Sequence, residues 1–198
     1  MRNLCNPDNK RTLKVVFLGR PGSGKTTAIS SASTDTHLTT EVRTTDSVSL
    51  IKDKTTIGID YGECNFDNNL TLRLYGTPGQ RRYDYLQTQT IAKTDIYVIL
   101  VDLSSVAPFA EFMYYKEIID SSGNDAALRV VAFTHYDMRE HEMTQLSKEI
   151  RHKYHSEILT LKIDTRKKDE VRLMLKKTAQ IKLSSLPSEQ YYIENNLF

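Results

Sequence analysis

Residues 19–26, GRPGSGKT, decide the fold of this chain. They match the pattern G-x-x-x-x-G-K-[ST] in full, and they directly follow the predicted first strand, Leu13–Leu18. Glycines let a backbone turn its N–H groups inward around phosphate oxygens, and the start of a helix adds a partial positive charge. The stretch therefore predicts a strand, then a phosphate-binding loop, then a helix from Lys25 to about Ser33.

The side chains of this loop indicate binding of a nucleoside triphosphate. Lys25 is expected to reach the β- and γ-phosphates, and the Thr26 hydroxyl is expected to bind Mg²⁺. Pro21 has no N–H and a fixed φ, so it restricts the loop locally. The predicted phosphate-binding residues are Gly19, Pro21, Gly22, Ser23, Gly24, Lys25, Thr26 and Thr27.

Beyond the loop, short β-branched runs alternate with helical patterns, which is typical of an α/β fold with a mainly parallel sheet. Residues 58–64 and 70–75 are predicted to form a hairpin that turns at Asp67–Asn69, and residues 34–55 to be mostly loop. The other predicted strands are 96–101, 130–133 and 158–163, and the other predicted helices are 109–119, 143–154 and 169–181.

Length and composition exclude several classes of protein. The 198 residues, of which 39% are apolar and 26% charged, suffice for one compact core. A net charge of +2 gives no global support for a nucleic-acid partner. The longest apolar run, Ile96–Val101, is too short to span a bilayer, and the N-terminus has no apolar signal region. Two distant cysteines, Cys5 and Cys64, exclude a disulfide scaffold, so we expect a cytoplasmic protein.

Two later stretches resemble the nucleotide switches of Ras-like small GTPases. They are TTIGIDYG, residues 55–62, and LYGTPGQRRY, residues 74–83, in which Thr56 and Gly79-Gln80 have the switch spacing. Thr56 could place a second hydroxyl on Mg²⁺, and the Gly79 N–H could bind the γ-phosphate from the other side. The Gln80 amide both donates and accepts, as a group that orients an attacking water must. The candidate catalytic residues are Gln80, Lys25 and Thr56, and the candidate metal ligands are Thr26 and Thr56.

The resemblance is closer to bacterial small GTPases of the MglA and conservon types, which carry T-P-G-Q or P-G-Q where Ras and Rab proteins carry D-T-A-G-Q. Thr39-Thr40-Glu41 and Asp164-Thr165-Arg166 also look like conservon-type landmarks. The resemblance implies a P-loop NTPase fold with a mainly parallel central sheet, one antiparallel strand and helices on both faces. It implies a GTPase domain over 12–181, flanked by an N-terminal extension, 1–11, and a C-terminal tail, 182–198. It also implies GTP and GDP as ligands, Mg²⁺ as cofactor and a regulator of the roadblock type.

One departure from the family pattern concerns the metal. Gly76 stands where Ras and Rab proteins have an Asp that holds Mg²⁺ through water. We expect weaker retention of Mg²⁺, or compensation by another carboxylate. Asp60 and Asp102 are the candidates, although Asp102 also fits the end of a strand.

A second departure concerns the base. Ras-like proteins read guanine with N-K-x-D, and this chain has Thr134-His135-Tyr136-Asp137 at that place. The Asp137 carboxylate can still accept from guanine N1 and N2, which favours GTP over ATP. His135 could stack on the base, whereas Thr134 lacks the amide. The predicted nucleotide-binding residues outside the phosphate loop are Thr134, His135, Asp137, Asp164, Thr165 and Arg166.

The sequence leaves the hydrolysis rate open. Arg43 and Arg81 could supply positive charge in cis, or they could be solvated surface residues. Without such a charge, hydrolysis is expected to be slow until a partner contributes one. The alternatives are a pseudo-GTPase that holds nucleotide with weak or no hydrolysis, and an ATP-binding P-loop protein.

Two surfaces are candidates for partners. Residues 151–182 have ten Lys or Arg against four Asp or Glu, which fits either a solvated helix face or a surface for an acidic partner or an anionic membrane. Tyr83, Tyr85 and Leu86 follow the second switch, where they either read out the nucleotide state to an effector or pack in the core.

Overall fold

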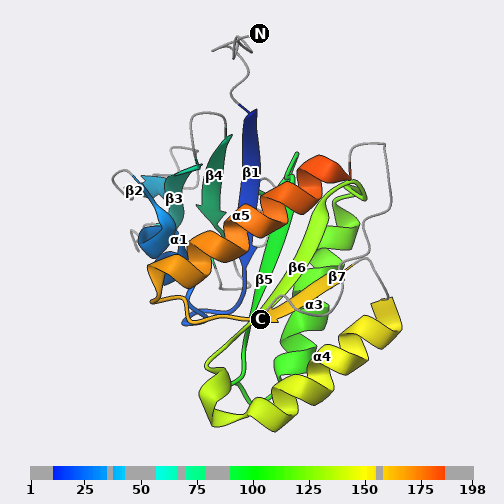
Figure 1. Cartoon of the computed structure of the whole chain (residues 1–198). Helices are drawn as coiled ribbons and strands as arrows, with labels where there is room; N and C mark the ends of the chain where they lie inside the picture. The colour runs from blue at the N-terminus through cyan, green and yellow to red at the C-terminus, as the bar shows by residue number, and fades with distance from the viewer. Residues whose placement is uncertain are drawn as a thin grey trace, which may run out of the picture.

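The computed structural model describes residues 11–34, 38–42, 57–66, 70–78, 90–154 and 158–185. They form a seven-stranded sheet of order β2-β3-β4-β1-β5-β6-β7 (Figure 1). The strands are β1 (Arg11–Leu18), β2 (Leu38–Val42), β3 (Ile57–Phe66), β4 (Leu70–Gly76), β5 (Ile96–Asp102), β6 (Leu128–Thr134) and β7 (Ile158–Lys162). The helices are α1 (Lys25–Ala32), α3 (Pro108–Ser121), α4 (Glu140–Tyr154) and α5 (Lys168–Ser184), with a short 3₁₀ helix η2 (Tyr136–Met138).

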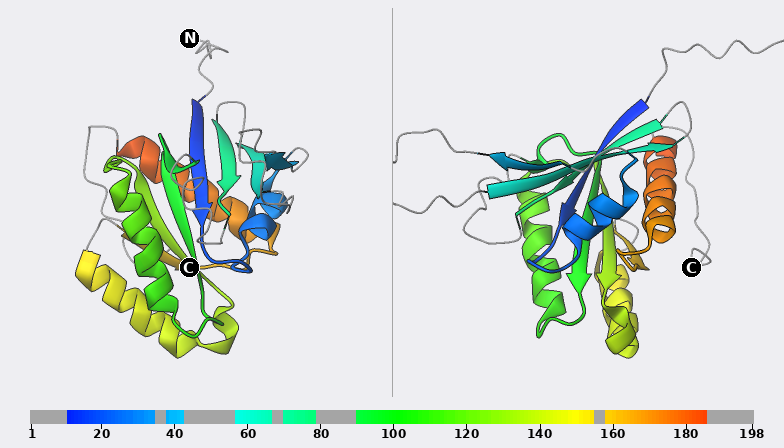
Figure 2. Two further views of the ribbon diagram at one scale, coloured as in Figure 1. Left: turned by 180° about the vertical axis from the view of Figure 1, so that it is seen from behind. Right: turned by 90° about the vertical axis from the view of Figure 1, so that its left-hand side faces the viewer.

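The predicted fold class is confirmed. Only β3 runs antiparallel to its neighbours, β2 and β4, and all other neighbouring pairs in the described sheet are parallel. Helices lie on both faces, with α1 and α5 on one and α3 and α4 on the other (Figure 2). The predicted hairpin is present as the β3–β4 pair, in which Phe66 lies opposite Leu70, whereas its turn residues lie outside the described ranges.

Successive side chains of the central strands point to opposite faces of the sheet and form two hydrophobic cores. Val15 and Phe17 of β1 pack with α1 and α5, while Val16 and Leu18 pack with α3 and α4. Every residue of β5 is buried, because this strand lies inside the sheet with helices on both sides. The continuous apolar run that predicted a buried strand therefore reflects burial of both of its faces.

One strand lies where the sequence predicted loop. β2 forms the edge of the sheet and pairs antiparallel with β3, with Thr40 opposite Ile59. An edge strand is held by main-chain hydrogen bonds along one side, so it needs little apolar patterning. Its threonines favour extended backbone, yet the polar composition of the segment masked that signal.

The parallel strands position the site, because their carboxyl ends meet at one edge of the sheet. The predicted phosphate loop follows β1, His135 follows β6, and Asp164 follows β7 closely. β5, between β1 and β6, ends at Asp102. Among the described helices, none combines the length and the apolar character needed to cross a membrane.

Candidate functional site

The loop between β1 and α1 has the backbone of an anion cradle. Gly19, Gly22 and Gly24 all have positive φ, at 149°, 84° and 99°. Gly24 precedes the first turn of α1, and no side chain of the described residues caps that turn. The unpaired N–H groups at such a helix start favour a negatively charged ligand. The Ser23 hydroxyl is fully buried and has no hydrogen-bond partner among the described residues.

Lys25 lies folded against this loop. Its Nζ donates to the carbonyls of Gly19 and Arg20, each at 2.7 Å, and only 7% of the residue is exposed. Burial lowers the pKa of Lys25 to about 8, although the nearby Asp60 opposes the shift. The two carbonyls aim the ammonium at the loop, where an anionic ligand would restore its preference for the charged form.

A hydroxyl and a carboxylate meet at the start of α1. Thr26 Oγ1 donates to Asp60 Oδ2 at 2.5 Å. Asp60 lies opposite Gly76 in the β3–β4 pair, and a Cβ placed on Gly76 would be 3.1 Å from Asp60 Cβ and 3.2 Å from Asp60 Oδ2. The Asp60 carboxylate therefore occupies the space next to the position where the family pattern has an acidic side chain. These hard oxygen donors fit Mg²⁺.

The loop after β6 carries the predicted base-reading residues. Thr134 is 2% exposed, and its hydroxyl has no partner among the described residues. His135 adopts positive φ, 52°, and its Nδ1 lies 2.9 Å from Asp102 Oδ1. Asp137 follows in η2 and is exposed, so its carboxylate is accessible to a ligand.

The loop between β7 and α5 packs against the phosphate loop. A Cβ on Gly24 would be only 2.7 Å from Thr165 Oγ1, and Ser31 Oγ of α1 donates to the Thr165 carbonyl at 2.9 Å. Arg166 forms a bidentate pair with Asp164, through Nε at 2.8 Å and Nη2 at 2.9 Å. These bonds lower the pKa of Asp164 to about 2.

The two loops that are predicted to read the base lie close together. The hydrogen bonds of Arg166 to Asp164 raise the pKa of Arg166, and the nearby negative charge of Asp137 raises it further. The structure thus brings the predicted phosphate loop, Asp137 and the Asp164–Arg166 segment to one edge of the sheet. Thr27 lies exposed on α1, and Pro21 is exposed in the loop.

Several predicted residues cannot be placed. Thr56, Gly79 and Gln80 lie outside the described residues, as do Arg43, Arg81, Tyr83, Tyr85 and Leu86. Thr39–Glu41 lie in β2, of which only the backbone is described.

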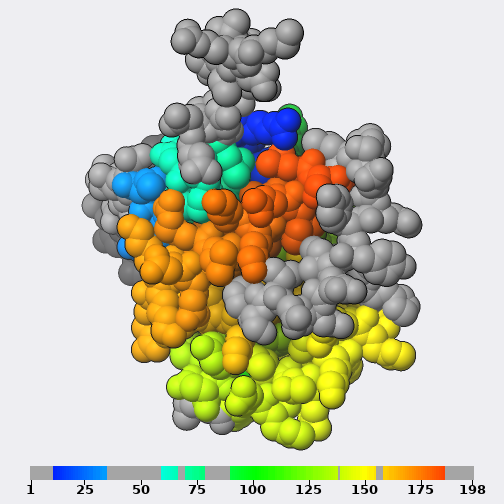
Figure 3. All heavy atoms as spheres, viewed as in Figure 1, coloured from blue at the N-terminus to red at the C-terminus, as the bar shows by residue number. Residues whose placement is uncertain are grey.

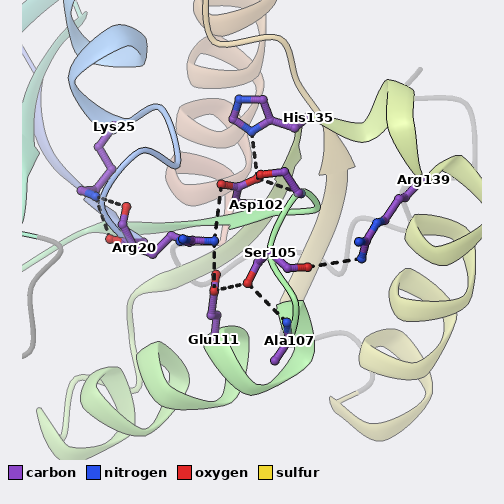
Figure 4. Close-up of polar contacts among 10 residues, drawn as sticks. Arg20, Lys25, Asp102, Ser105, Ala107, Glu111, His135 and Arg139 are labelled. Atoms are coloured by element: carbon purple, nitrogen blue, oxygen red, sulfur yellow. Dashed lines mark hydrogen bonds and ion pairs between the residues drawn. The ribbon is translucent and has the colours of Figure 1, made fainter.

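Sequence reasoning missed a polar network beside the loop (Figure 4). Asp102, one of the two proposed substitutes for a metal carboxylate, instead accepts from His135 and Ser104. Of the two candidates, Asp60 is therefore the one that contacts a predicted Mg²⁺ ligand. The remaining members of the network are Arg20, Ser105, Glu111 and Arg139. The acidic end of an otherwise apolar strand was the signal for Asp102; its partners lie too far along the chain for spacing to reveal them.

A mainly parallel sheet with this loop and the predicted base-reading segments at one edge is typical of a nucleotide-binding domain of the G-domain class. The Ras family model matches residues 14–183, and the chain belongs to the Ras family.

Similar proteins agree with this assignment. The human Ras-related protein Rab-44 is 27% identical over 139 residues, which are 69% of this chain and 12% of that protein. This chain thus spans about an eighth of the length of that relative. The solved G domain of the T. maritima FeoB iron transporter superposes with a TM-score of 0.61 at 13% identity, over 86% of this chain and 98% of that one. That likeness concerns the fold.

Proposed function

We propose that this chain is a small GTPase switch, which binds GTP and GDP with Mg²⁺ and hydrolyses GTP to GDP and phosphate. The observation that carries the proposal is the arrangement of Lys25, Thr26 and Asp60 at the start of α1. The ammonium is bound to loop carbonyls at 2.7 Å, and the hydroxyl is bound to the carboxylate at 2.5 Å. A cation and a pair of hard oxygen groups beside an uncapped helix start suit a metal-bound triphosphate.

Each residue has a distinct role in this proposal. Lys25 neutralises the β- and γ-phosphate oxygens, and the Gly79 N–H binds the γ-phosphate. Mg²⁺ would be held by Thr26 and Thr56, and when bound it would neutralise charge between the β- and γ-phosphates. Asp60 supplies the carboxylate that Gly76 cannot. Gln80 orients the attacking water, so loss of its amide affects hydrolysis rather than binding.

Asp137 reads the base in this proposal. Its exposed carboxylate, next to the Asp164–Arg166 segment, accepts from N1 and N2 of guanine, whereas adenine presents no such pair of donors. Competition between fluorescent GTP and unlabelled GTP or ATP tests this reading. GTP is expected to compete at least about tenfold better, and equal competition would favour the ATP-binding alternative.

A base switch provides the sharper version of that test. Asp137→Asn presents a donor as well as an acceptor, which suits xanthine better than guanine. The ratio of GTP to XTP affinity is expected to fall by about tenfold or more. An unaltered ratio would mean that guanine is read elsewhere.

Hydrolysis is tested by single-turnover phosphate release at saturating Mg²⁺. Wild-type protein is expected to release phosphate slowly, and Gln80→Leu to be slower by about tenfold or more with GTP affinity nearly intact. An unchanged rate in the variant would remove Gln80 from the mechanism. Absence of release by the wild type would favour the pseudo-GTPase alternative, which the altered residues Gly76, Thr134 and His135 motivate.

The finer assignments remain part of the proposal. A relationship to the MglA and conservon types, a bacterial origin and a roadblock-type regulator rest on the sequence motifs, and a cytoplasmic location rests on the cysteine content and the apolar pattern of the sequence. The domain bounds 12–181, the extension 1–11 and the tail 182–198 also rest on the sequence motifs. An effector is expected at the switches, and no nucleic acid is expected as partner.

The basic stretch 151–182 favours the solvated-face interpretation. Several of its basic side chains, on α5 and in the loop before it, have intramolecular partners; α5 crosses the surface seen in Figure 3. Arg166 pairs with Asp164, Lys167 with Glu170 at 2.8 Å, and Lys182 donates to a backbone carbonyl. Paired charges attract an acidic partner or an anionic membrane only weakly.

A further inference from the structure

The end of β5 joins the two halves of the nucleotide site. β1 leads into the phosphate loop and β6 leads into the base-reading loop, but these strands do not pair, because β5 lies between them. Contact between the two loops at this edge must therefore pass across the end of β5. The residue at that end is Asp102, which is 4% exposed.

The Asp102 carboxylate is shared by groups from both loops. Its Oδ1 accepts from the Ser104 N–H at 2.9 Å and the Ser104 hydroxyl at 2.6 Å, and it lies 2.9 Å from His135 Nδ1. Its Oδ2 lies 4.0 Å from Arg20 Nη1. Figure 4 shows Arg20 and His135 approaching this carboxylate from different elements.

A second set of contacts holds the same elements together. Arg20 Nη1 also lies 3.7 Å from Glu111 Oε1 of α3, and Ser105 Oγ donates to that same oxygen. Arg139, directly after η2, donates to the Ser105 carbonyl at 3.2 Å. The phosphate loop, the start of α3 and the base-reading loop are thus connected through the end of β5.

Among the described residues, the His135 ring has a hydrogen-bond partner at one nitrogen, Nδ1. Half of its side chain is exposed, and its backbone is left-handed. His135 directly precedes η2, which contains Asp137. With Nδ1 at Asp102, the remaining ring nitrogen and the ring face are available to a ligand at the carboxyl edge of the sheet. Loss of Asp102 would leave this ring without a partner that sets its orientation.

We infer that Asp102 is a positioning residue of the nucleotide site, which sets the orientation of His135 and ties it to Arg20 of the phosphate loop. Asp102 itself touches neither phosphate nor base; it acts through those two side chains. The inference rests on the proposed nucleotide binding and deepens it, because it names the residue that couples the two ends of the site.

A thermodynamic cycle on the full chain tests the inference. Binding of fluorescent GDP is measured for the wild type, Asp102→Ala, the Arg20→Ala/His135→Ala double variant, and the triple variant. Asp102→Ala is expected to weaken GDP binding by about tenfold, because a buried charge-assisted acceptor is lost. In the background without Arg20 and His135, the same change is expected to cost less than about twofold.

A matched control separates positioning from general stability. Asp95 flanks the other end of β5, and its Oδ2 accepts from the Lys14 N–H at 2.7 Å. Asp95→Ala is expected to lower the thermal midpoint without changing GDP affinity. Should Asp102→Ala fold poorly, Asp102→Asn keeps the shape and the acceptor for His135 but removes the charge facing Arg20. That variant is expected to lose about threefold in affinity, and only while Arg20 is present.

The outcomes are distinguishable. Wild-type affinity in both Asp102 variants, or losses that multiply with those of Arg20 and His135, would overturn the inference while leaving the proposed function intact. Failure of the wild type to bind GDP at all would overturn both.

Discussion

The amino group of Lys25 is buried, and burial disfavours its charged form as long as no anion is bound beside it. In the described structure its pKa is about 8 because burial disfavours the charged form. Triphosphate binding restores the preference for the ammonium, so the complex takes up a proton wherever free Lys25 is neutral. The pH dependence of binding therefore reports on this residue.

We expect GTP affinity to be constant below pH 8 and to fall as pH rises above it. The pKa of Lys25 is about 8 in the free protein and is expected to be higher in the complex. Between these two pKa values, GTP affinity falls by up to about tenfold for each unit of pH. Titrations of fluorescent GTP from pH 6.5 to 9 measure the slope. Lys25→Arg is the control, since arginine stays charged over this range. A wild-type slope no steeper than that of the arginine variant would show that Lys25 is already charged when free.

In the proposed site, Asp60 would make Mg²⁺ binding depend on a residue of β3, whereas the family pattern has its acid on β4. Asp60→Asn keeps an acceptor for Thr26 but removes the negative charge, so Mg²⁺ is expected to be held about tenfold more weakly. The measurement is GDP release as a function of free Mg²⁺. Glu63→Gln, on the same strand but paired with Arg73, is the matched control. Identical Mg²⁺ dependence in both variants would contradict a metal role for Asp60.

At the scale of elements, the phosphate loop is held by the loop between β7 and α5. Gly24 has φ of 99° and faces Thr165, whereas Gly22 has φ of 84° and open space around its missing Cβ. Alanine at either position is strained by its backbone, at about 1–3 kcal/mol. Only alanine at 24 would also push against Thr165.

Gly24→Ala is therefore expected to weaken GTP binding more than Gly22→Ala, by about tenfold or more. The reason is displacement of the Thr165 loop, which carries predicted base contacts, in addition to backbone strain. Paired measurements of GTP affinity and thermal midpoint check this order. A Gly24→Ala/Thr165→Ala double variant removes both the hydroxyl and the methyl that the new Cβ would meet, and recovery to the level of Gly22→Ala would assign the extra loss to that side chain. Equal losses in the two alanine variants would mean that backbone strain alone decides them.

The elements differ in how far sequence could predict them. β5 is a continuous apolar run because both of its faces are buried, and α5 has apolar positions such as Val171 and Leu175 at helical spacing. β2 was missed because an edge strand depends on pairing with β3, which local composition does not encode. The phosphate loop was predictable because its chemistry is contained in eight consecutive residues. The Asp102 network was not, since it joins residues from Arg20 to Arg139 that only the parallel topology brings together.

At the scale of the whole molecule, Arg172 joins three elements. From α5 it donates to the Ala32 carbonyl at the end of α1 and to the Asn65 carbonyl of β3, both at 2.9 Å. Its guanidinium also lies 4.8 Å from the centre of the Phe66 ring. One planar side chain thus satisfies a helix-end carbonyl and a strand carbonyl together, which a lysine cannot do in the same geometry.

Arg172→Lys is expected to lower the free energy of unfolding by about 1–3 kcal/mol, because one or both carbonyls lose a charged donor. Urea unfolding of the full chain measures the change. Lys176→Ala, an exposed position on the same helix, is the control and is expected to stay within about 0.5 kcal/mol of the wild type. Comparable losses in both variants would contradict a specific role of the bridging contacts, since neither change lowers helix propensity appreciably.

The reversed direction of β3 has a consequence for how such chains are compared. Because β3 and β4 run antiparallel, Asp60 and Gly76 are distant along the polypeptide and adjacent in space. A linear motif shows that this chain lacks an acid at position 76, whereas the fold places the Asp60 carboxylate directly across from it. A chain with the acid on one strand and glycine across from it would then be a variant of the same arrangement as a chain with the two exchanged. Such an exchange predicts that the residues at positions 60 and 76 covary among related chains.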